Sequence, residues 1–147
     1  MNFTVGKNKW GDVSVFLIDF LKKSCNNNAT VITLSGDLGS GKTTLVKEIA
    51  ESILIEEKVT SPTFVILKKY KINNKDLKFK NLIHIDAYRI EKQSELEYLK
   101  MEDFLENKDN LIMIEWPENI ENIINRAHCN IQIEHIDGES RKVRILL

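Results

Sequence analysis

A short apolar run at residues 29–34 leads directly into a glycine-rich stretch, and this junction constrains the fold more than any other feature of the chain. Residues 36–43 match the pattern G-x-x-x-x-G-K-[ST] at every position, and the apolar residues that follow recur at helical spacing. The predicted order is therefore strand, glycine-rich loop and helix. Glycines let successive backbone N–H groups converge on phosphate oxygens, and a helix N-terminus adds partial positive charge. The segment thus predicts a binding site for the phosphates of a nucleotide.

Two side chains of this loop carry specific chemistry in such a site. The Lys42 ammonium can reach the β- and γ-phosphates, and the Thr43 hydroxyl can take one coordination position on Mg²⁺. Asp37 is unusual because its carboxylate stands in a loop that holds anions, and both a catalytic role and a turn or capping role remain open. The candidate residues for binding the nucleotide are Gly36, Asp37, Leu38, Gly39, Ser40, Gly41, Lys42, Thr43 and Thr44.

Phosphoryl transfer also requires a carboxylate near the magnesium ion, usually at the end of a neighbouring buried strand. Two apolar runs, 82–86 and 111–115, end in Asp86 and Glu115. Ligands of open α/β sheets lie at the carboxyl ends of the strands, so both acids are expected near the glycine-rich loop. We predict Lys42, Asp86 and Glu115 as catalytic residues. The alternative for each acid is that it caps the segment following its strand.

Other polar and aromatic residues near these strand ends have two interpretations each. Thr60, Ser61 and Thr63 place three hydroxyls in a turn after the first loop and helix, where they either sense the γ-phosphate or Mg²⁺ or form local bonds around a proline. Trp116 follows Glu115 directly and is either a lid on the core or a contact surface. His84 alternates with isoleucines, which favours a structural histidine over a catalytic base.

The remaining pattern predicts an α/β fold. Apolar spacing indicates helices at 13–23 and 94–105, and strands at 63–70, 82–86 and 111–115. Alternating segments at 130–136 and 141–147 flank an Asp-Gly pair, which is a strong hairpin signal. The fold class is therefore a P-loop NTPase-like sheet flanked by helices, with a C-terminal antiparallel hairpin. We predict that residues 1–147 form a single P-loop ATPase domain.

Composition narrows the possible partners and location. The 147 residues include 21 Lys and Arg against 22 Asp and Glu, so no overall positive field steers the chain onto nucleic acid. Cys25 and Cys129 lack the paired spacing of zinc or redox motifs and are expected to be reduced thiols. Residues 1–10 contain no long apolar run for secretion or membrane insertion. A cytoplasmic protein with no membrane contact is predicted.

Four motifs together resemble one known family. They are GDLGSGKTT at 36–44, SPTF at 61–64, HIDAYR at 84–89 and EWPE at 115–118. In order and approximate spacing they are similar to the bacterial TsaE (YjeE) proteins, small P-loop ATPases of tRNA threonylcarbamoyladenosine biosynthesis. An acidic residue at Asp37 is usual in that family. The departures are Ser40, where the family commonly has alanine, and Ala87, where it often has a larger apolar residue.

The resemblance implies a function and roles for individual residues. It implies binding of ATP and Mg²⁺ by an ATPase that is weak alone and depends on partners. These partners are TsaB and TsaD, the latter being the threonylcarbamoyl transferase, and tRNA is reached only indirectly through their complex. The Mg²⁺ ligands would be Thr43 and Glu115, while Asp86 would position the metal or the attacking water. Trp116 would serve activity or docking, and residues near 10–12 would contact the adenine.

Two rival functions remain open at this stage. A small nucleoside or nucleotide kinase shares the loop and a strand-end acid, but it usually needs an arginine-bearing lid, and the chain has only Arg89, Arg126, Arg141 and Arg144. A binding module gated by the nucleotide without meaningful turnover fits the shortage of catalytic arginines. A GTPase is disfavoured because no N-K-x-D guanine-reading pattern occurs.

Overall fold

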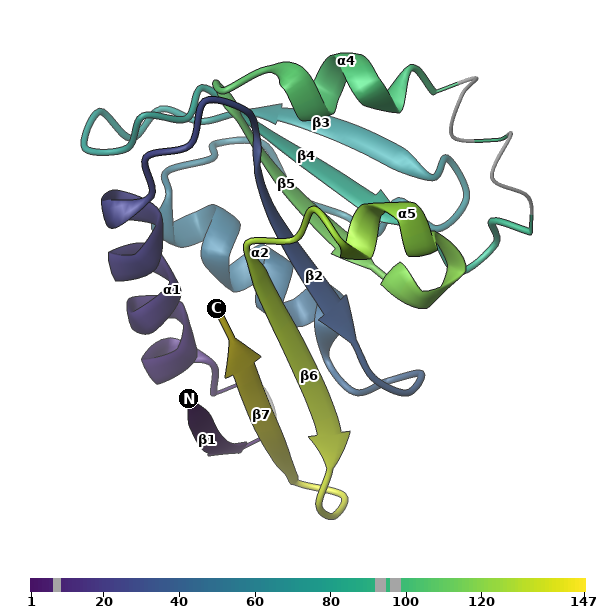
Figure 1. The fold of residues 1–147 in the computed structure, drawn as a ribbon. Coiled ribbons are helices and arrows are strands. Elements are labelled where there is room, and N and C mark those ends of the chain that lie inside the picture. The colour runs from purple at the N-terminus through teal and green to yellow at the C-terminus, as the bar shows by residue number, and fades with distance from the viewer. Residues whose placement is uncertain (7–8, 92–94, 96–98) are drawn as a thin grey trace.

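The computed structural model describes residues 1–6, 9–91, 95 and 99–147, and in this part of the chain seven strands form one mixed sheet with helices on both faces (Figure 1). The strand order is β1-β7-β6-β2-β5-β4-β3. The strands are β1 (Asn2–Gly6), β2 (Thr30–Ser35), β3 (Leu67–Lys71), β4 (Asn81–Asp86), β5 (Asn110–Glu115), β6 (Cys129–His135) and β7 (Ser140–Leu146). The helices are α1 (Gly11–Lys23), α2 (Lys42–Ser52), α4 (Met101–Glu106), α5 (Glu121–Ile124) and the 3-10 turn η1 (Pro117–Asn119).

The centre of the sheet is parallel and its borders are antiparallel. Strands β6, β2, β5 and β4 run in one direction, whereas β3 pairs antiparallel with β4, and β7 pairs antiparallel with both β6 and β1. Strand β5 is buried at all six positions, as expected for a parallel strand covered on both faces. The predicted α/β fold class and its C-terminal antiparallel hairpin are therefore confirmed.

Two apolar clusters hold the helices against opposite faces of the sheet. Along β2, Ile32 and Leu34 belong to the cluster that includes α1 and α2, whereas Val31 belongs to the cluster that includes α4 and α5. This split follows from the two-residue period of a strand, which sends successive side chains to opposite faces. Every second residue of β4 and β5 consequently faces α2, the helix that begins at the glycine-rich loop.

Most predicted bounds differ from the structure by one or two residues, and the larger differences concern β3, β1 and α4. The strand predicted at 63–70 begins only at Leu67, because the amides of Val65 and Ile66 both bond to the Pro62 carbonyl in a tight turn. Strand β1 was not predicted, since an edge strand buries few residues and Val5 alone in it is buried. The helix predicted at 94–105 is seen as α4 from Met101, and residues 92–94 and 96–98 lie outside the described part. No helix among the described residues is long and apolar enough to cross a bilayer.

Candidate functional site

The loop between β2 and α2 has backbone conformations that only glycine adopts easily. Gly36 has φ 139° and Gly41 has φ 110°, both outside the range that L-residues favour. A Cβ atom on Gly36 would lie 2.2 Å from the Ile133 carbonyl oxygen, and one on Gly41 would lie 2.4 Å from an indole carbon of Trp10. The loop is thus pressed against β6 and against Trp10. Trp10 is only 2% exposed and packs under the loop, whereas the neighbouring Gly11 and Asp12 are exposed, so an adenine contact at 10–12 stays a prediction.

Lys42 folds back over the loop. Its ammonium donates to the carbonyl oxygens of Gly36 at 2.6 Å and Asp37 at 3.0 Å, and it lies 3.8 Å from the ring centroid of Trp116. Burial lowers the pKa of Lys42, while nearby carboxylates, of which Glu115 acts most strongly, oppose that change. Among the described residues, the acceptors within hydrogen-bond reach of the ammonium are both neutral carbonyls, and an anionic phosphate would be a better partner than either.

Glu115 connects the start of α2 to the interior of the sheet. The Thr43 hydroxyl lies 2.8 Å and 2.9 Å from the two carboxylate oxygens of Glu115, and His84 Nε2 lies 2.8 Å from Oε1. Glu115 is 2% exposed and His84 is fully buried. Since carboxylate oxygens accept, both neighbours act as donors and together fix the plane of the carboxylate. The predicted pair Thr43 and Glu115 is thus brought into direct contact.

Asp86 lies beside this group but has different partners. Its Oδ2 accepts from the Thr63 hydroxyl at 2.5 Å, and its Oδ1 accepts from the Tyr88 amide at 3.0 Å. The Ser61 hydroxyl lies 2.6 Å from that of Thr63. Two of the three hydroxyls singled out in the sequence therefore lead to Asp86, whereas Thr60 accepts from Lys68 instead. The turn before β3 is connected to the site by its side chains.

A cleft of about 350 Å³ joins these groups. Six of the nine predicted nucleotide-binding residues line it, and Gly36, Asp37 and Ser40 do not. The Asp37 side chain is exposed while its carbonyl bonds to Lys42, and no contact with another described residue gives its carboxylate a role. Its catalytic role and its turn or capping role both stay open. The lining residues are Leu38, Gly39, Gly41, Lys42, Thr43, Thr44, Ser61, Thr63, Asp86, Tyr88, Glu115 and Trp116.

The oxygen donors in the cleft suit a magnesium ion that is shared with phosphates. In the described residues no group of three or more His, Cys, Asp or Glu side chains gathers as a metal cage. Thr43 and Glu115 instead offer one hydroxyl and one carboxylate within 2.9 Å of each other. Mg²⁺ commonly takes one or two protein oxygens and completes its shell with water and substrate phosphates. The residues present therefore fit the ion that the sequence predicted.

Sequence reasoning missed two residues of this region. His84 is fully buried, as expected for the structural histidine that the sequence favoured, but its contact with Glu115 was not predicted. Its place two residues before Asp86, on the same face of β4, was the available signal. Arg141 comes from the distant strand β7, is 5% exposed, and donates from Nε to the Ser40 carbonyl at 3.2 Å. No local pattern indicates that contact, because only the sheet order brings β7 near the loop.

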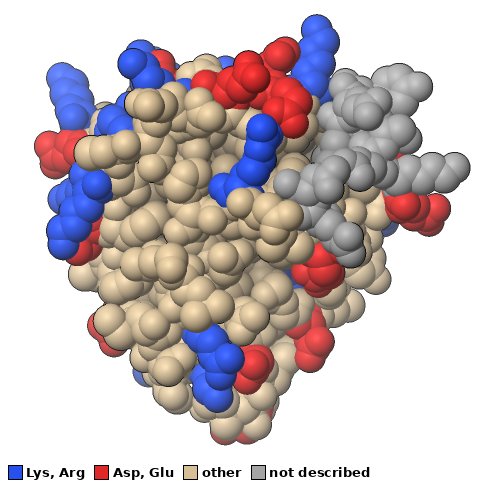
Figure 2. Space-filling model, in the orientation of Figure 1, with Lys and Arg blue, Asp and Glu red and all other residues tan. Residues whose placement is uncertain are grey.

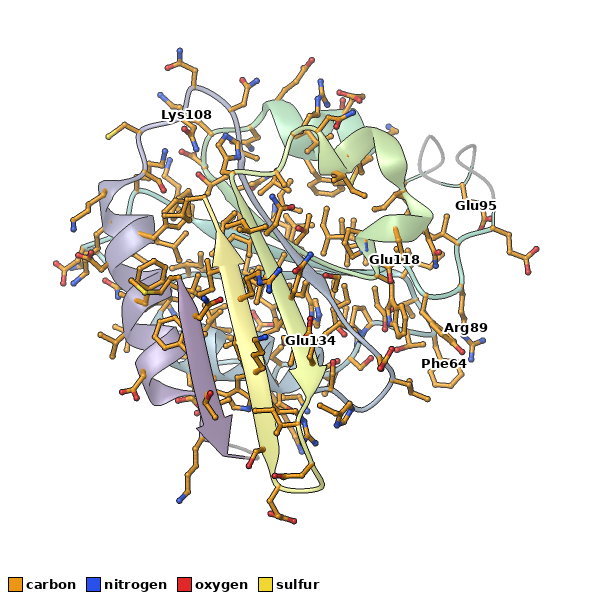
Figure 3. The ribbon with its side chains drawn as sticks, turned by 60° about the horizontal axis from the view of Figure 1, so that its bottom comes forward. Phe64, Arg89, Glu95, Lys108, Glu118 and Glu134 are labelled. Atoms are coloured by element: carbon orange, nitrogen blue, oxygen red, sulfur yellow. The ribbon has the colours of Figure 1, made fainter. Side chains whose placement is uncertain are left out.

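Two exposed aromatic side chains stand at the mouth of the cleft or next to it: Tyr88 lines the cleft, and Phe64 follows Thr63, which lines it. Phe64 is 83% exposed, and its ring lies 4.5 Å from the Arg89 guanidinium. Figure 3 shows these two side chains next to each other. Tyr88 is half exposed and packs against Trp116 with ring centroids 5.0 Å apart. On the face drawn in Figure 2, Lys and Arg are interspersed with Asp and Glu, and the described residues there form no continuous basic surface.

Comparison with known proteins agrees with this architecture. The family described as "Threonylcarbamoyl adenosine biosynthesis protein TsaE" matches residues 15–143. TsaE of Haemophilus influenzae is 31% identical over 128 residues, which cover 87% of this chain and 77% of that protein. TsaE of Bacillus subtilis is 36% identical over 113 residues, covering 77% and 66% respectively. The crystal structure of Bacillus subtilis YdiB superposes with a TM-score of 0.63 at 24% identity, over 97% of this chain and 83% of that one, and so has the same fold. The chain belongs to the TsaE family, whose members take part in tRNA threonylcarbamoyladenosine biosynthesis.

Proposed function

We propose that this chain is a Mg²⁺-dependent ATPase that acts with TsaB and TsaD to support threonylcarbamoyl transfer to tRNA. The observation that carries the proposal is the convergence of Lys42, Thr43, Asp86 and Glu115 on one cleft beside the glycine-rich loop. These residues come from three different strand or loop ends, and together they make up a phosphate cradle with two acids beside it.

Each residue has a distinct task in ATP hydrolysis. Lys42 exchanges its carbonyl partners for phosphate oxygens, and the loop amides bind the same phosphates. Thr43 and Glu115 are the residues that would hold Mg²⁺, which neutralises charge on the β- and γ-phosphates when bound. Asp86, oriented by Thr63 and the Tyr88 amide, has free lone pairs to orient the attacking water.

Partner dependence follows from what the cleft lacks. No arginine is among the described residues that line it. An arginine that stabilises transition-state charge raises turnover by about 10³ to 10⁵ in related reactions. We therefore expect slow hydrolysis by the isolated chain and faster hydrolysis in complex with TsaB and TsaD, whose binding would cover the exposed aromatic groups at the cleft mouth.

The proposal is tested by calorimetric titration with ATP and by ATPase assays with and without TsaB and TsaD. Lys42→Ala should abolish tight binding, whereas Asp86→Ala and Glu115→Ala should retain ATP and hydrolyse little. Lys47→Ala is the matched control, because Lys47 lies on the exposed face of the same helix. Unchanged titrations for the Lys42 variant would refute the phosphate cradle.

The shortage of arginine also favours a second candidate, a binding module gated by nucleotide without meaningful turnover. Reconstituted tRNA modification separates the two functions. If a non-hydrolysable ATP analogue sustains many rounds of modification, binding alone suffices. If it supports one round only, hydrolysis resets the complex. Rapid phosphoryl transfer to a nucleoside by the isolated chain would instead identify a kinase.

A further inference from the structure

Arg141 makes an unusual set of contacts beneath the glycine-rich loop. It lies on β7 with 5% exposure, and its Nε donates to the Ser40 carbonyl at 3.2 Å. A terminal nitrogen donates to the carbonyls of Asp137 at 3.0 Å and Ser140 at 2.9 Å. Among the described residues no carboxylate lies within ion-pair distance of its guanidinium. Among the described residues, the hydrogen bonds of this nearly buried cation thus go to carbonyl oxygens alone, one of which belongs to the loop. The Asp137 carboxyl lies beyond ion-pair distance and interacts with Arg141 only through the weaker attraction that helps to lower its pKa.

This arrangement is costly for stability alone. Burying a charge without a partner of opposite sign is unfavourable, and an apolar side chain of similar length would avoid that cost. In Figure 1 the β6–β7 turn and the loop after β2 lie at the same end of the sheet. The cation therefore stands at the end where the proposed nucleotide phosphates would bind, and it contributes positive potential there.

Peptide geometry links the Arg141 contact to the cleft. The Ser40 carbonyl and the Gly41 N–H belong to one planar trans peptide unit, in which the two groups point in opposite directions. Arg141 draws the Ser40 carbonyl toward β7, so the Gly41 N–H is turned away from β7. Ser40 is fully buried, whereas Gly41 lines the cleft. The Gly41 N–H, which is directed away from β7, therefore points toward the cleft. A flipped peptide would present a carbonyl oxygen to the phosphates and repel them.

We propose that Arg141 is a positioning residue that keeps the Gly41 N–H directed at a bound phosphate. This inference rests on the proposed nucleotide binding and adds a contribution from the C-terminal hairpin to the phosphate site. Arg141 acts on the loop and touches neither Thr43 nor Glu115. Its removal should weaken nucleotide binding to the same extent with Mg²⁺ and with excess EDTA.

The test compares Arg141→Met with Arg144→Met, because Arg144 lies on the same strand with its side chain exposed. ATP affinity is measured by calorimetry with Mg²⁺ and with EDTA, and the Gly41 amide is followed by ¹H–¹⁵N NMR during the titration. We expect at least a roughly tenfold loss of affinity for Arg141→Met in both conditions, the effect of losing a charged hydrogen bond. The downfield shift of the Gly41 proton on ATP addition should disappear. Arg144→Met should behave as wild type.

The outcomes separate the inference from the proposal beneath it. If the wild-type chain fails to bind ATP, the proposed function is wrong. If the wild type binds and a folded Arg141→Met binds equally, with an unchanged Gly41 shift, the positioning role is refuted. Should Arg141→Met fail to fold, Arg141→Lys takes its place: it keeps the charge without the planar fork, and an unaltered Gly41 shift in that variant overturns the inference.

Discussion

Replacing His84 by leucine tests how strongly the buried side chains of the sheet control the proposed Mg²⁺ site. His84 Nε2 donates to Glu115 Oε1 at 2.8 Å, and the Thr43 hydroxyl supplies the other side-chain bonds to that carboxylate. Leucine fills similar space without a donor, so the Glu115 carboxylate would lose one of its restraints. Glutamine places an amide nitrogen near the position of Nε2 and should restore it. The pair His84→Leu and His84→Gln therefore separates the hydrogen bond from the volume of the side chain.

Two estimates give the size of the effect on Mg²⁺ affinity. A hydrogen bond to a charged group contributes about 1.5–3 kcal/mol. Loss of a residue that orients a metal ligand typically lowers metal affinity about 10- to 100-fold, which corresponds to about 1.4–2.8 kcal/mol. The two ranges agree. Stability should change less, because His84 Nδ1 has no hydrogen-bond partner among the described residues, and removing that buried atom relieves a penalty of about 1–3 kcal/mol.

The assay is a Mg²⁺ titration of the protein in the presence of ATP, combined with ATP binding in EDTA and urea unfolding. His84→Leu should weaken the Mg²⁺ dependence about 10- to 100-fold while leaving ATP affinity in EDTA unchanged. Met113→Leu is the control, since Met113 is buried and pairs with His84 across β4 and β5. The reasoning fails if the Met113 variant loses as much Mg²⁺ affinity, or if His84→Gln is no better than His84→Leu.

Three further predictions rest on the same contacts. Gly41→Ala should destabilise the fold by several kcal/mol and prevent ATP binding, because the new Cβ would lie 2.4 Å from an indole carbon of Trp10. Gly39→Ala has open space around its Cβ and should lower the free energy of unfolding by only about 1–2 kcal/mol. Urea unfolding of the two variants measures this difference. Burial lowers the pKa of Lys42 in the folded protein below its ordinary value of 10.5. At a pH between the folded and the unfolded pKa, the unfolded chain binds more protons, so the free energy of unfolding rises with pH. Lys42→Met should lack that rise when urea midpoints are measured across the alkaline range. Burial raises the pKa of the Cys129 thiol to about 12, whereas Cys25 is exposed. A thiol reagent should therefore modify one cysteine in the native protein and two in denaturant. Fast reaction of both cysteines in the native protein would contradict the burial of Cys129.

The sequence predicted features that depend on neighbouring residues of the chain, and it missed contacts between residues that are far apart in the sequence. The loop at 36–43 was predictable because glycine geometry and phosphate chemistry dictate its residues locally. Asp86 and Glu115 were predictable as strand-end acids, since the sheet rule needs only the apolar runs before them. The contacts of His84 and Arg141 were not, because each depends on which strands are neighbours and in what register. Local patterns specify elements, whereas partners across the sheet require the assembled topology.

Strand order also distinguishes the two acids, whose roles the sequence left unresolved. Strand β5 lies between β2 and β4, and Glu115 aligns with Leu34 at the end of β2, directly before the loop. Asp86 pairs with Glu115 across β4 and β5, and it is one strand further from β2 than Glu115 is, a step of about 4.8 Å. Glu115 is therefore the acid within reach of Thr43, while Asp86 is linked to the turn that contains Thr63. Within the proposed ATPase site, the order β2-β5-β4 thus favours Glu115 over Asp86 as the ligand for Mg²⁺ and leaves Asp86 for the role of orienting water.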